Sequence, residues 1–173
     1  MKNRVLISFC LLLFITGGNS QQLTSFTVTM HPDSISYLSI SKKQVYTESE
    51  AADIKTSLDF ALIFTKDAFS PKLEWYNLSG KDGNIPGNLT GTAARINALS
   101  FDREQFDKCK TAKDLNRMTG HITSNSFSHY ASVSHTKDAI NQHCFLADST
   151  NGKRVLIWIS KDVDHGYKVE VKQ

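Results

Sequence analysis

Several stretches of the chain alternate apolar and polar residues one by one. In residues 23–30, Phe26, Val28 and Met30 occupy alternate positions, and serine and threonine lie between them. A period of two places the two sets on opposite faces of a β-strand. We therefore predict a strand with one buried and one solvated face, and residues 35–41 repeat the pattern.

Residues 57–65 alternate in the same way but are more apolar. The positions on one face are Leu58, Phe60, Leu62 and Phe64. The opposite face also becomes apolar midway, which is typical of a strand that is covered on both sides. A central strand of a sheet is predicted here.

The C-terminal region predicts three strands in succession. Asn151 and Gly152 stand between two strand-like runs. Asn-Gly favours a two-residue type I′ hairpin turn, because both central residues of that turn need positive φ. His165 and Gly166 offer a second turn before a last alternating strand over residues 167–171. Together these features predict a three-stranded antiparallel meander.

Two segments have the pattern of helices. Thr47 and Glu50 have the spacing of a capping box, which predicts a short helix over residues 48–55. Residues 101–120 have a helical apolar stripe, interrupted by a second capping signal at Thr111. The longer helix can therefore divide into two short ones.

Residues 70–95 are rich in Gly, Asn, Ser and Pro and predict a long irregular loop. The loop carries Trp75 and Tyr76. An exposed aromatic side chain there could stack on a sugar ring or anchor a partner protein, so both residues are candidate ligand-binding residues. In the alternative interpretation they fold back and cover the core.

The elements together predict one α+β domain over residues 21–173. An antiparallel sheet of about six to eight strands would pack against one short and one longer helix. About 153 residues suffice for one domain with a substantial core.

The first twenty residues have the layout of a secretory signal peptide. Lys2 and Arg4 precede an apolar run over residues 5–15, and small residues follow it. The run is shorter than the roughly 20 residues of a spanning helix. We expect cleavage near Ser20, export to the periplasm or the cell exterior, and no membrane span afterwards.

The net charge of the chain limits the kinds of partner that we expect it to bind. Without Lys2 and Arg4 the formal net charge falls from +3 to +1, and no Lys/Arg block is present. The electrostatic pattern of nucleic-acid binding is therefore missing. Asn77 and Asn88 begin N-x-[ST] patterns, which mark glycan acceptors in a secretory eukaryote and carry no such meaning in a bacterium.

Cys109 and Cys144 would remain after removal of the leader. An exported protein can keep a disulfide between them, and its loop of about 35 residues would contribute roughly 3–4 kcal/mol. Alternatively, both are buried thiols that act as small apolar side chains.

Residues 121–143 contain His121, His129, His135 and His143. Their even spacing would place them on one face of an uninterrupted strand, and His129 and His135 are the best candidates for a metal or haem site. The segment lacks the closely spaced H-x-H, H-E-x-x-H and C-x-x-C pairs of metal proteins. Ordinary polar histidines and a pH-sensitive surface are the alternatives.

An enzyme of unfamiliar type is a further alternative. The chain has no G-x-S-x-G motif. Carboxylates for acid–base chemistry would come from Asp59, Asp102, Glu104 or Asp148, and nothing in the sequence distinguishes them from solvated charges. The preferred hypothesis is a non-catalytic binding module without a cofactor, with an unknown protein or glycan as its ligand.

The region around residues 37–71 resembles small exported β-rich proteins of Bacteroidota. The matching residues are Val45, Tyr46, Thr47, Glu50, Ala51, Asp59, Phe60, Ser70 and Pro71. The resemblance covers about a fifth of the chain and implies a β-rich exported fold. Since such proteins have no assigned activity, it implies no catalytic residue.

Overall fold

The computed structural model describes residues 21–30, 35–65, 72–79, 89–134, 142–149, 152–161 and 167–173. The predicted signal peptide and the predicted turn at His165 and Gly166 lie outside the described residues, as do His135, Asn88 and Asn151.

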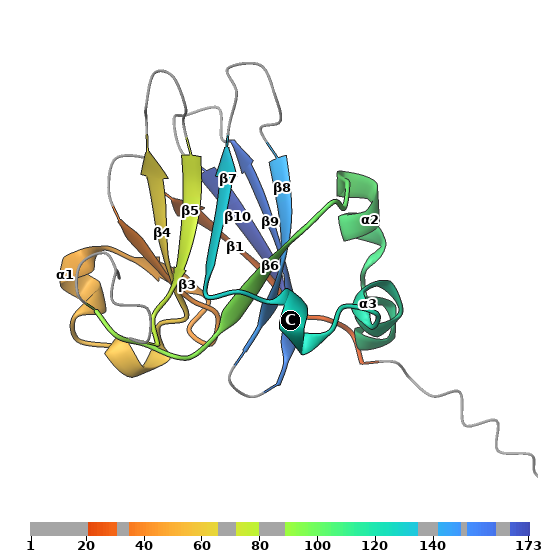
Figure 1. The fold of residues 1–173 in the computed structure, drawn as a ribbon, viewed down its shortest axis with the longest axis horizontal. Helices are drawn as coiled ribbons and strands as arrows, with labels where there is room; N and C mark the ends of the chain where they lie inside the picture. The colour runs from red at the N-terminus through yellow and green to blue at the C-terminus, as the bar shows by residue number, and fades with distance from the viewer. Residues whose placement is uncertain are drawn as a thin grey trace, which may run out of the picture.

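The strands of the described residues form two five-stranded antiparallel sheets (Figure 1). Sheet 1 has the order β1 (Ser25–Met30), β10 (Tyr167–Lys172), β9 (Arg154–Lys161), β8 (Gln142–Asp148) and β6 (Arg95–Leu99). Sheet 2 has the order β3 (Gln44–Tyr46), β2 (Ser36–Ser39), β4 (Phe60–Thr65), β5 (Lys72–Asn77) and β7 (Tyr130–Ser134). The antiparallel, β-rich architecture is confirmed, whereas the predicted count of six to eight strands in one sheet is wrong.

The two sheets enclose the main hydrophobic core. Its largest fully buried side chains include Met30, Phe60, Trp75 and Phe145. Because both sheets contribute alternate residues to this layer, the alternation in β1 is confirmed: Phe26, Val28 and Met30 face the core.

The predicted C-terminal meander is confirmed, because β9 pairs with both β8 and β10. Asn151 of the first predicted turn lies outside the described residues, so the type I′ turn stays a prediction. Ser149 N–H donates to Lys153 O, Gly152 N–H donates to Ser149 O, and Gly152 has φ +68°. Gly152 therefore takes the left-handed backbone conformation that glycine favours.

Strand β9 is apolar on both faces because both are covered. Val155, Ile157 and Ile159 face the core between the sheets. Leu156 and Trp158 point outward and are also buried, under the helices. The uninterrupted apolar run of this strand therefore reflects burial on two sides.

Helices cover the outer face of sheet 1 and part of the outer face of sheet 2. Helices α2 (Arg103–Lys108) and α3 (Ala112–Thr119) cover sheet 1 (Figure 1). Helix α1 (Glu48–Ala51) and the short 3-10 helix η1 (Lys55–Ser57) lie beside sheet 2. A second 3-10 helix, η3 (Ser124–Ser126), precedes β7 in the chain. The predicted capping boxes, at Thr47 and Thr111, are present. The predicted helix over residues 48–55 ends earlier, and the longer helix is divided.

The predicted irregular loop over residues 70–95 contains strand β5. Its burial alternates, with Leu73, Trp75 and Asn77 buried and the residues between them more exposed. Strand β5 lies between β4 and β7, so the backbone of β5 is paired on both sides. The local Gly and Asn content indicated a loop, but this nonlocal pairing determines the conformation.

Candidate functional site

Two tyrosines and a glutamate meet on the outer face of sheet 2. Alternation along β5 places Glu74 and Tyr76 on the face opposite Trp75. The register with β7 sets Tyr130 opposite Tyr76 and Ser132 opposite Glu74. We call this group, Glu74, Tyr76, Tyr130 and Ser132, the tyrosine surface.

The side chains of the tyrosine surface contact one another directly. The rings of Tyr76 and Tyr130 have centroids 5.0 Å apart and are tilted by 57°. Tyr130 Oη donates a hydrogen bond of 2.6 Å to Glu74 Oε1. Tyr130 is 42% exposed and is the large hydrophobic residue that the described part of the chain leaves exposed.

Partial burial raises the pKa of both phenols, and the Glu74 carboxylate adds to the rise. Both tyrosines are therefore neutral at physiological pH and remain hydrogen-bond donors. An exposed ring beside a carboxylate and two hydroxyls can stack on an apolar ligand face and exchange hydrogen bonds at its edge.

Trp75 does not lie where a ligand could reach it. The side chain is 0% exposed and packs between the sheets. Its ring centroid lies 5.6 Å from that of Phe60 and 5.0 Å from that of Phe145. The placement matches the alternative interpretation, in which Trp75 belongs to the core, so Tyr76 alone remains of the two predicted ligand-binding residues.

Tyr130 was not predicted as a site residue. In residues 130–134, Ala131 and Val133 alternate with more polar residues, which is a weak signal for a strand with one polar face. The sequence does not reveal that this strand pairs with β5, and only that pairing brings Tyr130 to Tyr76.

The histidines of residues 121–143 are spread over different parts of the fold. His121 follows α3 and is exposed, and His129 immediately precedes β7. His143 is the second residue of β8, on the core side, with its ring centroid 6.3 Å from that of Phe145. In Figure 1 β7 and β8 run in opposite directions, so their first residues lie at opposite ends of the sandwich.

Within the part of the chain that the structure describes, no group of three His, Cys, Asp or Glu side chains could hold a metal ion. Since His135 lies outside the described residues, the predicted pair His129 and His135 stays a prediction.

Cys109 and Cys144 are buried free thiols, and the described residues contain no disulfide. Both belong to the cluster of apolar side chains between α2, α3 and sheet 1. Burial raises the pKa of Cys144 to about 12 and also raises the pKa of Cys109. This placement matches the alternative in which both act as small apolar side chains.

Asn77 is not an exposed acceptor. Its side chain is 5% exposed, and its Nδ2 donates a hydrogen bond of 2.5 Å to Ala94 O. Its Oδ1 accepts from Ser79 N–H at 2.7 Å. Asn77 is therefore not accessible as a glycan acceptor in the folded protein.

All four carboxylates considered for acid–base chemistry have partners within the protein. Asp59 is buried and accepts from Ile40 N–H at 2.8 Å and Thr92 Oγ1 at 2.7 Å. Asp102 caps α2, and Asp148 pairs with Arg95 at 2.8 Å. The fourth, Glu104, pairs with Lys108 on the solvent side of α2. Within the described residues they do not converge on one point.

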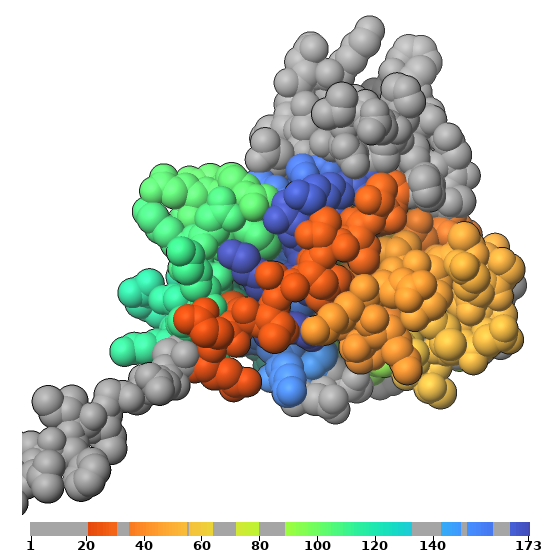
Figure 2. Space-filling view, turned by 180° about the vertical axis from the view of Figure 1, so that it is seen from behind, coloured from red at the N-terminus to blue at the C-terminus, as the bar shows by residue number. Residues whose placement is uncertain are grey.

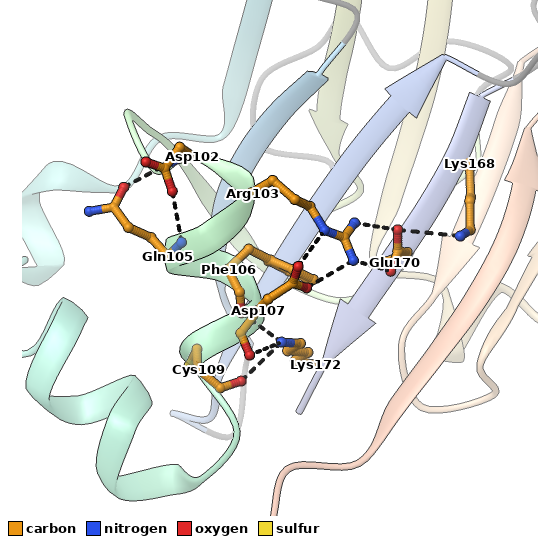
Figure 3. A network of polar contacts seen from close by, with 9 residues as sticks. All are labelled: Asp102, Arg103, Gln105, Phe106, Asp107, Cys109, Lys168, Glu170 and Lys172. Carbon is orange, nitrogen blue, oxygen red and sulfur yellow. Dashed lines mark hydrogen bonds and ion pairs between the residues drawn. The ribbon is translucent and has the colours of Figure 1, made fainter.

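A polar network fixes α2 on sheet 1 (Figure 3). Arg103 Nη1 and Nη2 donate to the two carboxylate oxygens of Glu170 at 2.6 and 3.1 Å. Its Nε donates to Asp107 at 3.0 Å, and the guanidinium lies 5.2 Å from the ring centroid of Phe106 and 5.6 Å from that of Trp158. A bidentate ion pair on aromatic faces is a strong attachment.

Lys172 completes the network at the other end of α2. Its Nζ donates to the carbonyl oxygens of Phe106 at 2.6 Å and Cys109 at 3.1 Å. The last carbonyls of a helix lack partners within the helix, so the ammonium group satisfies them. The network thus explains how α2 is held on sheet 1. The polar groups of the network already have hydrogen-bond partners there.

Among the helices of the described residues, none has the length and apolar character needed to cross a bilayer. Comparison of the chain with protein-family models, with curated proteins and with solved structures found no match.

Proposed function

We propose that this protein is a non-catalytic, exported binding module that recognises a glycan through the tyrosine surface of sheet 2. The observation that carries the proposal is the 42% exposure of Tyr130 beside Tyr76 and Glu74. A sugar offers a face of C–H bonds to an aromatic ring and hydroxyl groups to a carboxylate.

The composition of the surface supports a glycan over a protein partner. A stable protein interface buries about 800 Å² on each partner and has an apolar centre. Among the described residues one large hydrophobic side chain, Tyr130, is exposed, and Glu74 and Ser132 near it on the same face are polar. One ring with polar groups beside it matches the size of one or two sugar units.

The surface is also prepared for binding. Tyr130 is held by the hydrogen bond to Glu74 and by the ring of Tyr76, so little side-chain freedom is lost when a ligand stacks on it. Both strands lie within a five-stranded sheet, which fixes the spacing of the three side chains. The predicted leader peptide supports a location outside the cytoplasm, where glycans are common ligands.

A glycan array screened with the wild-type chain and with variants tests the proposal. We expect Tyr130→Ala to abolish binding to the saccharides that the wild-type chain binds on the array. Glu74→Gln should weaken this binding. Tyr130→Phe keeps the ring and should weaken binding by less than Tyr130→Ala does.

Tyr46→Phe is the matched control, because Tyr46 is a half-buried tyrosine on β3 at the opposite edge of sheet 2. It should bind as the wild type does. An array on which the wild type binds nothing, or on which Tyr130→Ala binds normally, would overturn the proposal.

A further inference from the structure

A cleft lies beside sheet 1, away from the tyrosine surface. It is a cleft of about 360 Å³ between residues 21–23, α3, the start of β9 and Gln173. In Figure 2 the first described residues, in red, lie against the green helices and the blue C-terminal strands on this side of the molecule.

Backbone hydrogen bonds hold the walls of the cleft in place. Ala112 N–H donates to Gln21 O, and Leu23 N–H donates to Lys110 O, both at 2.9 Å. On the other side Thr24 and Gln173 exchange two backbone bonds of 2.8 and 2.9 Å. The cleft therefore exists before any ligand binds, as most small-molecule sites do.

The polar groups that line the cleft are amides and cations. Gln21, Gln22, Asn116 and Gln173 supply amide side chains, which both donate and accept hydrogen bonds. Lys153 and Arg154 supply positive charge, and none of the ten lining residues has an acidic side chain.

Arg154 is fixed in position. Its Nη1 and Nη2 each donate a 2.5 Å bond, to Thr119 O and Ile122 O respectively. The guanidinium also lies 5.7 Å from the ring centroid of Phe127. Its charge therefore stays beside the cleft, whereas Lys153 is exposed at the hairpin and can close on a ligand.

We propose that this cleft binds a small hydroxylated organic anion of the chemical class of sugar acids. The volume falls in the range of about 300–1,000 Å³ that small-molecule sites occupy. The two cations match one carboxylate, the amides match hydroxyl groups, and Leu23 and Ala112 provide an apolar strip for a ring. This site does not depend on the tyrosine surface.

Isothermal titration calorimetry with D-glucuronate tests the proposal, with D-glucose and inorganic phosphate as comparison ligands. We expect glucuronate to bind and both comparison ligands to bind at least about tenfold more weakly, since each lacks one of the two recognised features. Lys153→Ala should weaken glucuronate binding by about tenfold, and Asn116→Ala should also weaken it.

Lys168→Ala is the matched control, because Lys168 is a half-exposed lysine on β10 that does not line the cleft. It and Tyr130→Ala should bind glucuronate normally. The proposal is overturned if glucuronate, galacturonate and N-acetylneuraminate all fail to bind, if glucose or phosphate binds as tightly as glucuronate, or if Lys153→Ala has no effect. Loss of binding in Tyr130→Ala would place the ligand at the other site and would also overturn it.

Discussion

Trp75 and Tyr76 are neighbours in the sequence, but their side chains lie on opposite faces of β5. Trp75 faces the core between the sheets, and Tyr76 faces outward beside Tyr130. The residues between 72 and 77 do alternate, but the Gly- and Asn-rich residues after them favoured the prediction of a loop. Which of the two aromatic residues lies in the core therefore depended on a strand that local sequence did not indicate.

This difference between the two faces predicts opposite effects of truncation. Trp75→Ala should lower the free energy of unfolding by about 3–5 kcal/mol, because it leaves a cavity in the core. Tyr130→Ala should lower it by less than about 1 kcal/mol, since the side chain is 42% exposed. Urea denaturation followed by tryptophan fluorescence for Tyr130→Ala, and by circular dichroism for both variants, measures the two values. Equal losses would contradict the assignment of the faces.

The buried position of Asp59 predicts that the stability of the fold depends on pH. Burial raises the pKa of this carboxyl, and the hydrogen bonds from Ile40 and Thr92 oppose the rise. A carboxyl whose pKa is higher in the folded than in the unfolded state holds its proton longer when folded. Asp59 therefore stabilises the fold most at pH values below its pKa in the unfolded chain, about 3.9. This contribution declines as pH rises through the pKa of Asp59 in the folded protein.

Asp59→Asn removes the titrating group and keeps the shape of the side chain. We expect the variant to gain stability relative to the wild type as pH rises from 3 to 7, measured by urea denaturation at each pH. A difference between the two proteins that stays constant across this range would show that the folded-state pKa of Asp59 is not raised.

The two thiols should be unreactive in the native state. With the pKa of Cys144 at about 12, almost none of it is thiolate at pH 8, and both thiols are buried. Iodoacetamide at pH 8 should label neither Cys109 nor Cys144 in the folded protein and both in 6 M guanidinium, as read by mass spectrometry. Labelling of either cysteine under native conditions would contradict their placement in the cluster under α2 and α3.

At the scale of elements, capping and turn residues were the most informative parts of the sequence. Both predicted capping boxes exist because each depends on residues only three positions apart. The meander was predictable for the same reason, since each strand pairs with the next one along the chain. The attachment of α2 was not, because Arg103 and Glu170 are 67 residues apart.

That attachment gives a prediction for Arg103→Ala. Removing the bidentate contact with Glu170 and the aromatic packing should lower the free energy of unfolding by about 1–2 kcal/mol, a value reduced for the 42% exposure of Arg103. Arg117→Ala is the control, since Arg117 is 73% exposed and pairs with Asp114 in the same helix, and should change stability by less than about 0.5 kcal/mol.

The same contact adds a pH dependence. The hydrogen bond from Arg103 lowers the pKa of Glu170 in the folded protein. The contact therefore stabilises the fold at pH values above the pKa of Glu170 in the unfolded chain, about 4.3. This stabilisation is lost as pH falls through the pKa of Glu170 in the folded protein. The difference between wild type and Arg103→Ala should therefore shrink in acid. A difference that grows below pH 4 would contradict this role of Glu170.

At the scale of the whole molecule, the division of the strands into two sheets decides which side chains meet on the surface. Tyr76 and Tyr130 come together because β5 pairs with β7, although α2, α3 and β6 lie between them in the chain. Periodicity indicates which residues share a face of one strand but not which strands are neighbours. The sequence therefore predicted the β-rich class and one residue of the tyrosine surface, but not the surface itself.

The most direct test of this surface is amide chemical-shift mapping in a ¹⁵N-labelled sample, titrated with the saccharide that the array selects. Our account predicts that the largest shifts fall on residues 72–77 and 130–134, and that they disappear in Tyr130→Ala. Shifts that fall on sheet 1 or the helices instead, or that persist in the variant, would contradict it.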